Sequence, residues 1–160
     1  MFGKIKYFLI TAIFFASVFA CVKKKTFSQN PEIEFKSFTL LLGDTAAELV
    51  IGFSDGDGDI GKEKEDKTNN FFMTYYYFDT VTAKFRAWYD TFNNDTLRIP
   101  YTIRKPADDY TGKPISGEVA VRINQYRPTK KHKRIKYVMY LLDNANNKSN
   151  ILTTPELLVP

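Results

Sequence analysis

Residues 117–124 of this 160-residue chain have the sequence Gly-Glu-Val-Ala-Val-Arg-Ile-Asn, and this stretch decides the fold. Val119, Val121 and Ile123 alternate with charged, small or amide side chains. Because successive side chains of an extended strand point to opposite faces, the three apolar residues share one face. The stretch therefore predicts a β-strand with one buried face.

A second alternating stretch, residues 97–104, contains a proline. Its apolar positions are Leu97, Ile99, Tyr101 and Ile103. Pro100 lies among them and cannot donate a hydrogen bond to a neighbouring strand. We therefore expect this strand at the edge of a sheet, or locally bulged.

Most of the remaining chain also favours extended structure. Further candidate strands are 33–41, 47–54, 70–79, 82–90, 135–142 and 151–158, which gives about eight in all. They are rich in aromatic and β-branched residues, and turn-forming Asp, Asn, Gly and Pro residues separate them. No helical crossover is visible, which favours antiparallel sheets. The sequence predicts an all-β antiparallel β-sandwich formed by one domain, residues 31–160.

Residues 1–21 have the pattern of a bacterial lipoprotein signal. Lys4 and Lys6 precede an apolar or small stretch, 7–20, that is shorter than a membrane-spanning helix requires. The stretch ends in Val18-Phe19-Ala20-Cys21, which resembles a lipobox although Phe19 is bulkier than the usual residue. We expect a signal peptide over 1–20, acylation of Cys21 by chains such as palmitate, and a polar linker over 21–30. The alternative is an ordinary secretory signal with an incidental cysteine.

Charge and cysteine content restrict the classes of partner. The chain has 23 basic and 18 acidic residues, a net charge of +5. Removing 1–20 takes away two lysines and leaves 21 basic against 18 acidic residues, or +3, which is too mildly basic to indicate nucleic acid. Lys23, Lys24 and Lys25 could contact anionic lipid headgroups or form only a solvated tether. Cys21 is the only cysteine, so a disulfide framework is excluded.

The strongest local motif is the run Phe-Ser-Asp-Gly-Asp-Gly-Asp-Ile-Gly at residues 53–61. Asp55, Asp57 and Asp59 alternate with residues that permit tight turns, so their carboxylates can converge on one cation. Hard oxygen ligands suit calcium better than zinc or copper. An EF-hand is excluded, because positions six and twelve of the loop are Ile60 and Asp66. The alternative is an Asx-rich turn whose carboxylates accept backbone N–H groups.

A second acidic loop, residues 143–150, follows the strand predicted at 135–142. Its sequence, Asp-Asn-Ala-Asn-Asn-Lys-Ser-Asn, resembles the Asp-Asn-Ala-Gly-Asn turn of bacterial extracellular immunoglobulin-like domains. Asn146 or Asn147 takes the glycine position, and asparagine tolerates a left-handed backbone. An immunoglobulin-like Greek key would place both acidic loops at one end, so that Asp143 completes the metal site. Simple up-and-down strand counting would instead separate them, unless one connection fails to reverse the chain.

Several motifs together resemble a group of uncharacterised Bacteroidota envelope lipoproteins with an immunoglobulin-like domain. They are the lipobox, the run at 53–61, Ile-Pro-Tyr at 99–101, Gly-Glu-Val at 117–119 and the closing stretch 148–156. The resemblance covers nearly the whole chain and implies an immunoglobulin-like β-sandwich in an outer membrane lipoprotein, without implying an activity. Surface-exported lipoproteins of such bacteria often carry acidic residues after the cysteine. The three lysines here favour the periplasmic side over the cell surface.

The side-chain inventory does not favour an enzyme. His132 is the only histidine and lies in the basic run 130–134, which predicts a solvated loop. No thiol remains after lipidation, and a Ser-His-Asp arrangement would have to recruit His132 from that loop. We expect a membrane-anchored lipoprotein with a structural or protein-interaction role, its partner an envelope protein, and calcium as its only candidate cofactor.

The alternative function is a glycan-binding module that uses exposed aromatic residues. Trp88 and Tyr76 are the candidate ligand-binding residues, and Trp88 shares a predicted strand face with Lys84 and Arg86. Aromatic rings on such a face could stack on a sugar. The other interpretation is that these rings belong to the core.

Overall fold

The computed structural model describes residues 27–41, 45–106 and 110–160, and their regular structure consists of β-strands alone. The predicted signal peptide and Cys21 lie outside the described residues. Within the part of the chain that is described, no helix is long and apolar enough to cross a membrane. The prediction of an all-β domain is confirmed.

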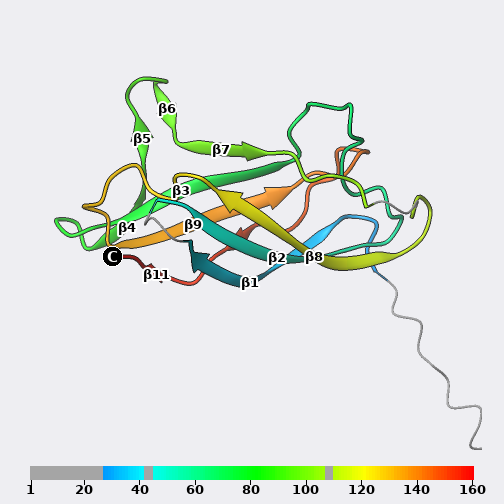
Figure 1. The fold of residues 1–160 in the computed structure, drawn as a ribbon, viewed down its shortest axis with the longest axis horizontal. Helices are drawn as coiled ribbons and strands as arrows, with labels where there is room; N and C mark the ends of the chain where they lie inside the picture. The colour runs from blue at the N-terminus through cyan, green and yellow to red at the C-terminus, as the bar shows by residue number, and fades with distance from the viewer. Residues whose placement is uncertain (1–26, 42–44, 107–109) are drawn as a thin grey trace, which may run out of the picture.

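One sheet has three antiparallel strands in the order β1-β2-β8 (Figure 1). Their bounds are β1 Glu32–Leu40, β2 Ala47–Asp55 and β8 Ile115–Ile123. The register of β1 against β2 shifts between Phe35 and Ser37. The stretch that decided the fold is β8, and its expected burial pattern is present, because Val121 and Ile123 are buried while Arg122 is exposed.

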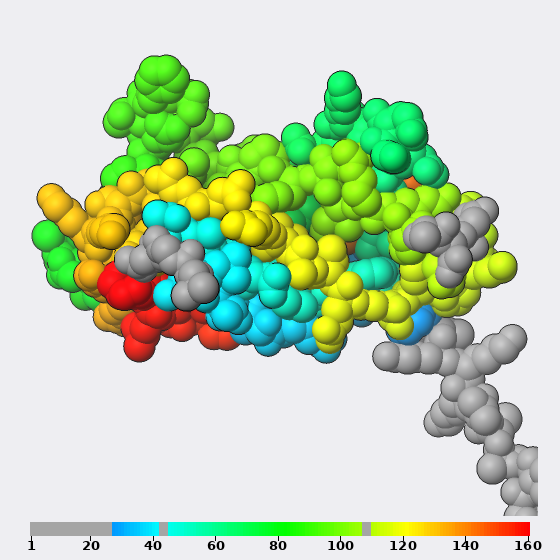
Figure 2. All heavy atoms as spheres, viewed as in Figure 1, coloured from blue at the N-terminus to red at the C-terminus, as the bar shows by residue number. Residues whose placement is uncertain are grey.

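The second sheet is built around β3 and β9, which pair antiparallel. Its long strands are β3 Phe71–Asp79 and β9 Arg134–Leu141. The short strands β10 Leu152–Thr153 and β11 Leu157–Leu158 pair with β9. On the far edge of β3 lie β4 Lys84–Ala87 and β7 Arg98–Tyr101. Between them, β5 Tyr89–Asp90 and β6 Asp95–Thr96 form a hairpin that projects from the body of the domain (Figures 1 and 2).

The connections between the two sheets form an immunoglobulin-like Greek key. β2 pairs with β8 rather than with β3, and β3 pairs with β9, so consecutive strands repeatedly change sheets. β4 and β7 run in the same direction along one edge of β3, one after the other. They therefore occupy one strand position, and the chain does not reverse between them. The expected position of the proline is confirmed, because Pro100 lies in β7 and β7 pairs only with β3 among the described strands.

The described residues form eleven strands where the sequence indicated about eight, because two expected strands are each broken into two and the short strand β6 was not expected. The strand expected over 82–90 breaks at Trp88, whose N–H bonds to the carbonyl of Tyr75 before the chain turns into the hairpin. The strand expected over 151–158 breaks around Pro155, which has no N–H. Thr154 continues the pairing with β9 there, since its hydroxyl oxygen accepts the N–H of Tyr137 at 3.1 Å.

The core lies between the two sheets and consists of alternate strand residues. β2 contributes Leu49 and Ile51, β3 contributes Met73 and Tyr75, and all four are fully buried. Burial of each such side chain stabilises the fold by about 1.5–3 kcal/mol. Tyr137 of β9 is also fully buried, and burial raises the pKa of its hydroxyl well above the ordinary value.

His132 lies in an aromatic cluster rather than in solvent. Its ring stacks on Tyr77 with centroids 4.1 Å apart, and it meets the ring of Trp88 edge-on at 5.0 Å. Its Nδ1 shares a 2.9 Å hydrogen bond with the hydroxyl of Tyr75. Burial, with a smaller contribution from the positive charge of Arg127, lowers the pKa of His132 below its ordinary value.

The lowered pKa of His132 predicts a loss of stability in mild acid. The unfolded chain takes up the imidazole proton near pH 6.5, whereas the folded chain takes it up only at lower pH. The stabilisation is thus complete above about pH 6.5 and is lost as the pH falls through the folded pKa. Urea unfolding at pH 7.5 and pH 5 should show a larger loss in wild type than in His132→Gln. Equal losses would contradict this assignment.

Candidate metal centre

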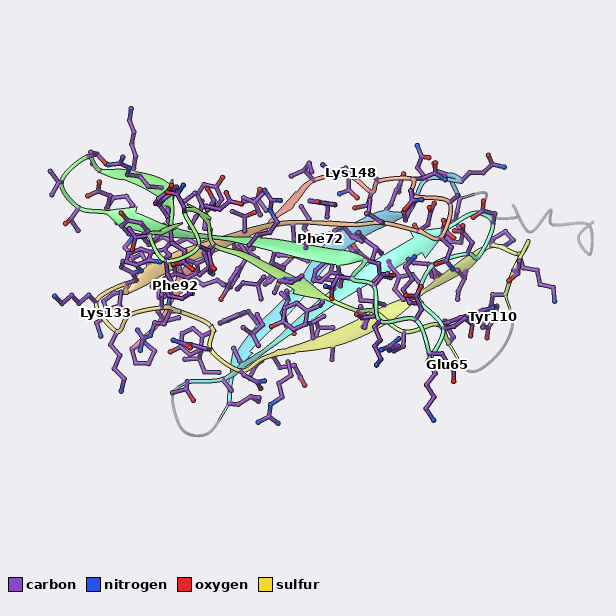
Figure 3. All side chains as sticks on the ribbon, turned by 90° about the horizontal axis from the view of Figure 1, so that it is seen from above. Glu65, Phe72, Phe92, Tyr110, Lys133 and Lys148 are labelled. Carbon is purple, nitrogen blue, oxygen red and sulfur yellow. The ribbon has the colours of Figure 1, made fainter. Side chains whose placement is uncertain are left out.

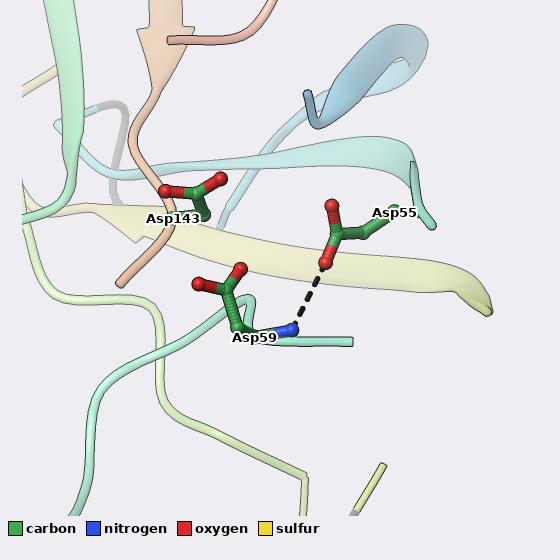
Figure 4. A group of neighbouring side chains, drawn as sticks. All are labelled: Asp55, Asp59 and Asp143. Carbon is green, nitrogen blue, oxygen red and sulfur yellow. Dashed lines mark hydrogen bonds between the residues drawn. The ribbon is translucent and has the colours of Figure 1, made fainter. Parts of the chain in front are cut away.

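Two acidic loops meet at one end of the sandwich. Asp55 is the last residue of β2, Asp59 follows in the next loop, and Asp143 is the second residue after β9. One carboxylate oxygen from each of the three lies within 4.8 Å of the others, and Figure 4 shows the three carboxyl groups facing a common space. The Greek key is the reason, because it brings the ends of β2 and β9 together.

Each of the three carboxylates is held in place by hydrogen bonds. Oδ2 of Asp55 accepts the N–H of Asp59 at 3.0 Å, and Oδ2 of Asp59 accepts the N–H of Ala145 at 3.0 Å. Asp143 accepts the backbone N–H of Asn147 at 2.7 Å and its side-chain amide at 2.8 Å. The bonds of Asp55 and Asp143 lie within their own loops, as the Asx-turn interpretation expects, whereas Asp59 bonds to the other loop. Together they occupy only some of the oxygens.

Three carboxylate oxygens of these loops have no hydrogen-bond partner among the described residues. They are the Oδ1 atoms of Asp55, Asp57 and Asp59, and all three atoms are buried. Asp55 as a whole is 0 % exposed. A buried carboxylate oxygen without a partner is costly, because the charge has lost its hydration. A bound cation would supply these oxygens with a partner.

The electrostatics of the cluster are strongly unfavourable without a cation. Burial, followed by the charges of Asp57 and Asp59, raises the pKa of Asp55 to about 6. Burial, followed by the charges of Asp143 and Asp57, also raises the pKa of Asp59. Asp57 lies outside the 4.8 Å group, but its charge acts on both neighbours. In the ranges 27–41, 45–106 and 110–160, no lysine or arginine forms an ion pair with these four carboxylates.

The spacing and chemistry of the donor set fit calcium. Calcium binds oxygens at about 2.3–2.6 Å, so two ligands on opposite sides of the ion lie up to about 5 Å apart. The separation of up to 4.8 Å between the carboxylate oxygens meets this limit. All the donors are carboxylates, which suits calcium rather than zinc or copper. The three converging carboxylates would leave further coordination positions for water or other oxygen ligands.

Backbone contacts fix the two loops against each other. The N–H of Asn144 bonds to the carbonyl of Asp59 at 3.2 Å, and its side-chain amide bonds to the carbonyl of Gly61 at 2.9 Å. The sequence left open whether Asn146 or Asn147 takes the left-handed position. Asn146 takes it, with a φ of 66°. The sequence singled out the acidic residues but not the orienting roles of Ala145 and Asn147, which depend on backbone N–H direction.

The candidate ligand-binding aromatics lie elsewhere and do not form one site. Trp88 is half-buried and packs edge-on against Tyr77, with ring centroids 5.7 Å apart. Tyr76 is a neighbour of Tyr77 along β3, so its side chain points to the opposite face of the sheet. Trp88 thus lies partly against the core, and Tyr76 cannot join it.

Comparisons of the chain with models of protein families, with curated proteins and with solved structures find no match. The functional argument therefore rests on the sequence and on the geometry described above.

Proposed function

We propose that this chain is a lipid-anchored, non-catalytic module of the bacterial cell envelope with a structural or protein-interaction role, stabilised by calcium. The observation that carries the proposal is the convergence of buried, unpartnered carboxylate oxygens at Asp55 and Asp59, next to Asp143. An ion there would neutralise the cluster and join the loop after β2 to the loop after β9. It would supply charge neutralisation and rigidity rather than chemistry.

The position of the cluster relates it to the proposed lipid anchor. Gly56, in the aspartate loop, lies against the backbone of Phe27 and Ser28, since a Cβ at this glycine would come within 2.8 Å of the Phe27 carbonyl oxygen. Cys21 precedes Phe27 by six residues, a reach of at most about 20 Å. The calcium site would therefore stiffen the membrane-proximal end of the domain. We place it at the outer membrane, on the periplasmic side, because of the three lysines after Cys21.

The far end of the domain suits contact with an envelope protein. Phe92, at the tip of the β5–β6 hairpin, is 94 % exposed. Figure 3 shows Phe92 at the opposite end of the molecule from Tyr110, whose carbonyl oxygen lies beside Gly58 of the aspartate loop. The engagement of His132 in its aromatic cluster supports a non-catalytic role, because its ring is stacked on Tyr77 and bonded to Tyr75.

Labelling with palmitate tests the lipid anchor. In cells that express the full chain, wild type should incorporate the labelled acyl chain and Cys21→Ser should incorporate none. Incorporation is a better readout than membrane fractionation, because an uncleaved apolar segment would itself hold the variant at the membrane. Label that persists in Cys21→Ser would exclude the anchor, and Lys23→Gln is the control that should label normally.

A further inference from the structure

A cavity of about 420 Å³ opens on the side of the sandwich where β7 and β8 face each other. These are edge strands of opposite sheets, and neither pairs with the other. The volume lies within the range of about 300–1,000 Å³ that is typical of small-molecule sites. The cavity contains Trp88 at one wall and Ile123, the last residue of β8, at the other.

The lining combines aromatic rings with polar side chains. Trp88 and Tyr101 supply the rings, and Asp90, Asn124 and Gln125 supply carboxylate and amide groups. Asn124 and Gln125 are exposed. Each amide offers two donors and one carbonyl acceptor. Asp90 accepts the N–H of Phe92 at 3.0 Å and the side-chain amide of Asn93, and its carboxylate retains further acceptor positions.

We propose that this cavity binds a neutral sugar ring. The C–H face of a sugar packs on an aromatic ring, while its hydroxyls bond to amides, which donate and accept, and to a carboxylate, which accepts. Among the described residues that line the cavity there is no lysine or arginine, and Asp90 would repel an anion. A purely apolar ligand would leave Asp90 without compensation for its lost hydration. The chemistry therefore selects a neutral, hydroxylated ligand.

The sugar site is spatially separate from the aspartate cluster. Ile123 lines the cavity, whereas Ile115, at the other end of β8, pairs with Asp55. The strand between them spans about 26 Å at roughly 3.3 Å per residue. The cavity thus faces away from the end where the chain enters the domain. The sugar proposal goes beyond the calcium proposal and does not depend on it.

Tryptophan fluorescence provides a direct test, because Trp88 is the only tryptophan in the chain. The full chain should be purified in a detergent without a sugar head group and titrated with six neutral oligosaccharides. The probes are hexasaccharides of β-1,4-glucose, β-1,3-glucose, mannose, xylose, galactose and N-acetylglucosamine. We expect a saturable change in emission with at least one of them, in calcium and in chelator alike. No change with any of the six at millimolar concentration overturns the proposal.

Variants at the polar wall distinguish the site from a change elsewhere in the fold. Asn124→Ala and Gln125→Ala retain the tryptophan signal and alter exposed residues, and each should weaken binding about five- to tenfold. Phe92→Ser, at the hairpin tip, is the matched control and should bind like wild type. A titration that is unchanged in the Asn124→Ala, Gln125→Ala double variant overturns the assignment of the cavity. If the wild-type chain binds a sugar but does not bind calcium, the result counts against the metal centre alone.

Discussion

Removal of calcium should lower the melting temperature of the full chain by roughly 5 to 10 °C. An ion present at about a hundred times its dissociation constant adds about 2.7 kcal/mol to the free energy of unfolding. In a domain of this size, each kcal/mol corresponds to a few degrees. The physical source is the relief of repulsion among Asp55, Asp59 and Asp143, whose carboxylate oxygens lie within 4.8 Å of one another. Thermal unfolding in excess calcium and in excess chelator measures the shift.

An Asp55→Asn variant should lose this calcium response, and in chelator it should be no less stable than wild type. Without calcium it should melt at or above wild type, because the substitution removes a buried charge whose pKa is raised to about 6. Glu65→Gln, which alters an exposed acidic residue outside the cluster, is the matched control and should respond to calcium like wild type. A full calcium response in Asp55→Asn would mean that the ion binds outside this cluster.

A large loss of stability is expected for Gly58→Ala, at about 2–5 kcal/mol. Gly58 has a φ of +69°, and a Cβ there would lie 2.1 Å from the carbonyl oxygen of Tyr110. The left-handed backbone alone costs an alanine about 1–2 kcal/mol. The contact with a backbone oxygen adds the cost of overpacking, about 1–3 kcal/mol. Urea unfolding of the variant and wild type measures the sum.

Gly112→Ala separates the two contributions. Gly112 has a similar φ of +76°, but a Cβ there would have nothing within 4 Å. It should therefore show only the backbone contribution, and the difference between the two variants reports how tightly the aspartate loop packs against residue 110. Equal losses would mean that the loop can move aside, which would weaken the case for a rigid metal centre.

The strands were predictable because alternation is a local property of the chain. Val121 and Ile123 are buried in β8 as the alternation required. Pro100 lies in an edge strand because it has no N–H to donate to a second neighbouring strand. The hairpin at 89–96 was not predictable, because Trp88 still bonds to Tyr75 of β3 and the chain leaves this edge only after it. The chain returns at Leu97, whose N–H bonds to the carbonyl of Trp88. Pairing between distant strands decides where such breaks occur.

The candidate site was predictable in its residues, but its closure depended on the strand topology, for which the sequence left two possibilities. The alternating aspartates at 55, 57 and 59 were visible in the sequence, whereas up-and-down counting would have placed Asp143 at the other end. That counting fails because β4 and β7 share one edge of β3 without reversing the chain. The position of Trp88 was also not predictable, since its partners His132 and Tyr77 come from a loop and another strand.

Calorimetric titration of calcium into the chelator-treated full chain tests the central claim most directly. The account predicts one ion per chain, with a dissociation constant of about 10⁻⁴–10⁻³ M as in extracellular calcium modules. It also predicts at least tenfold weaker binding in Asp143→Asn, because the ion is shared between the two loops. No binding at millimolar calcium, or unchanged affinity in Asp143→Asn, would contradict it.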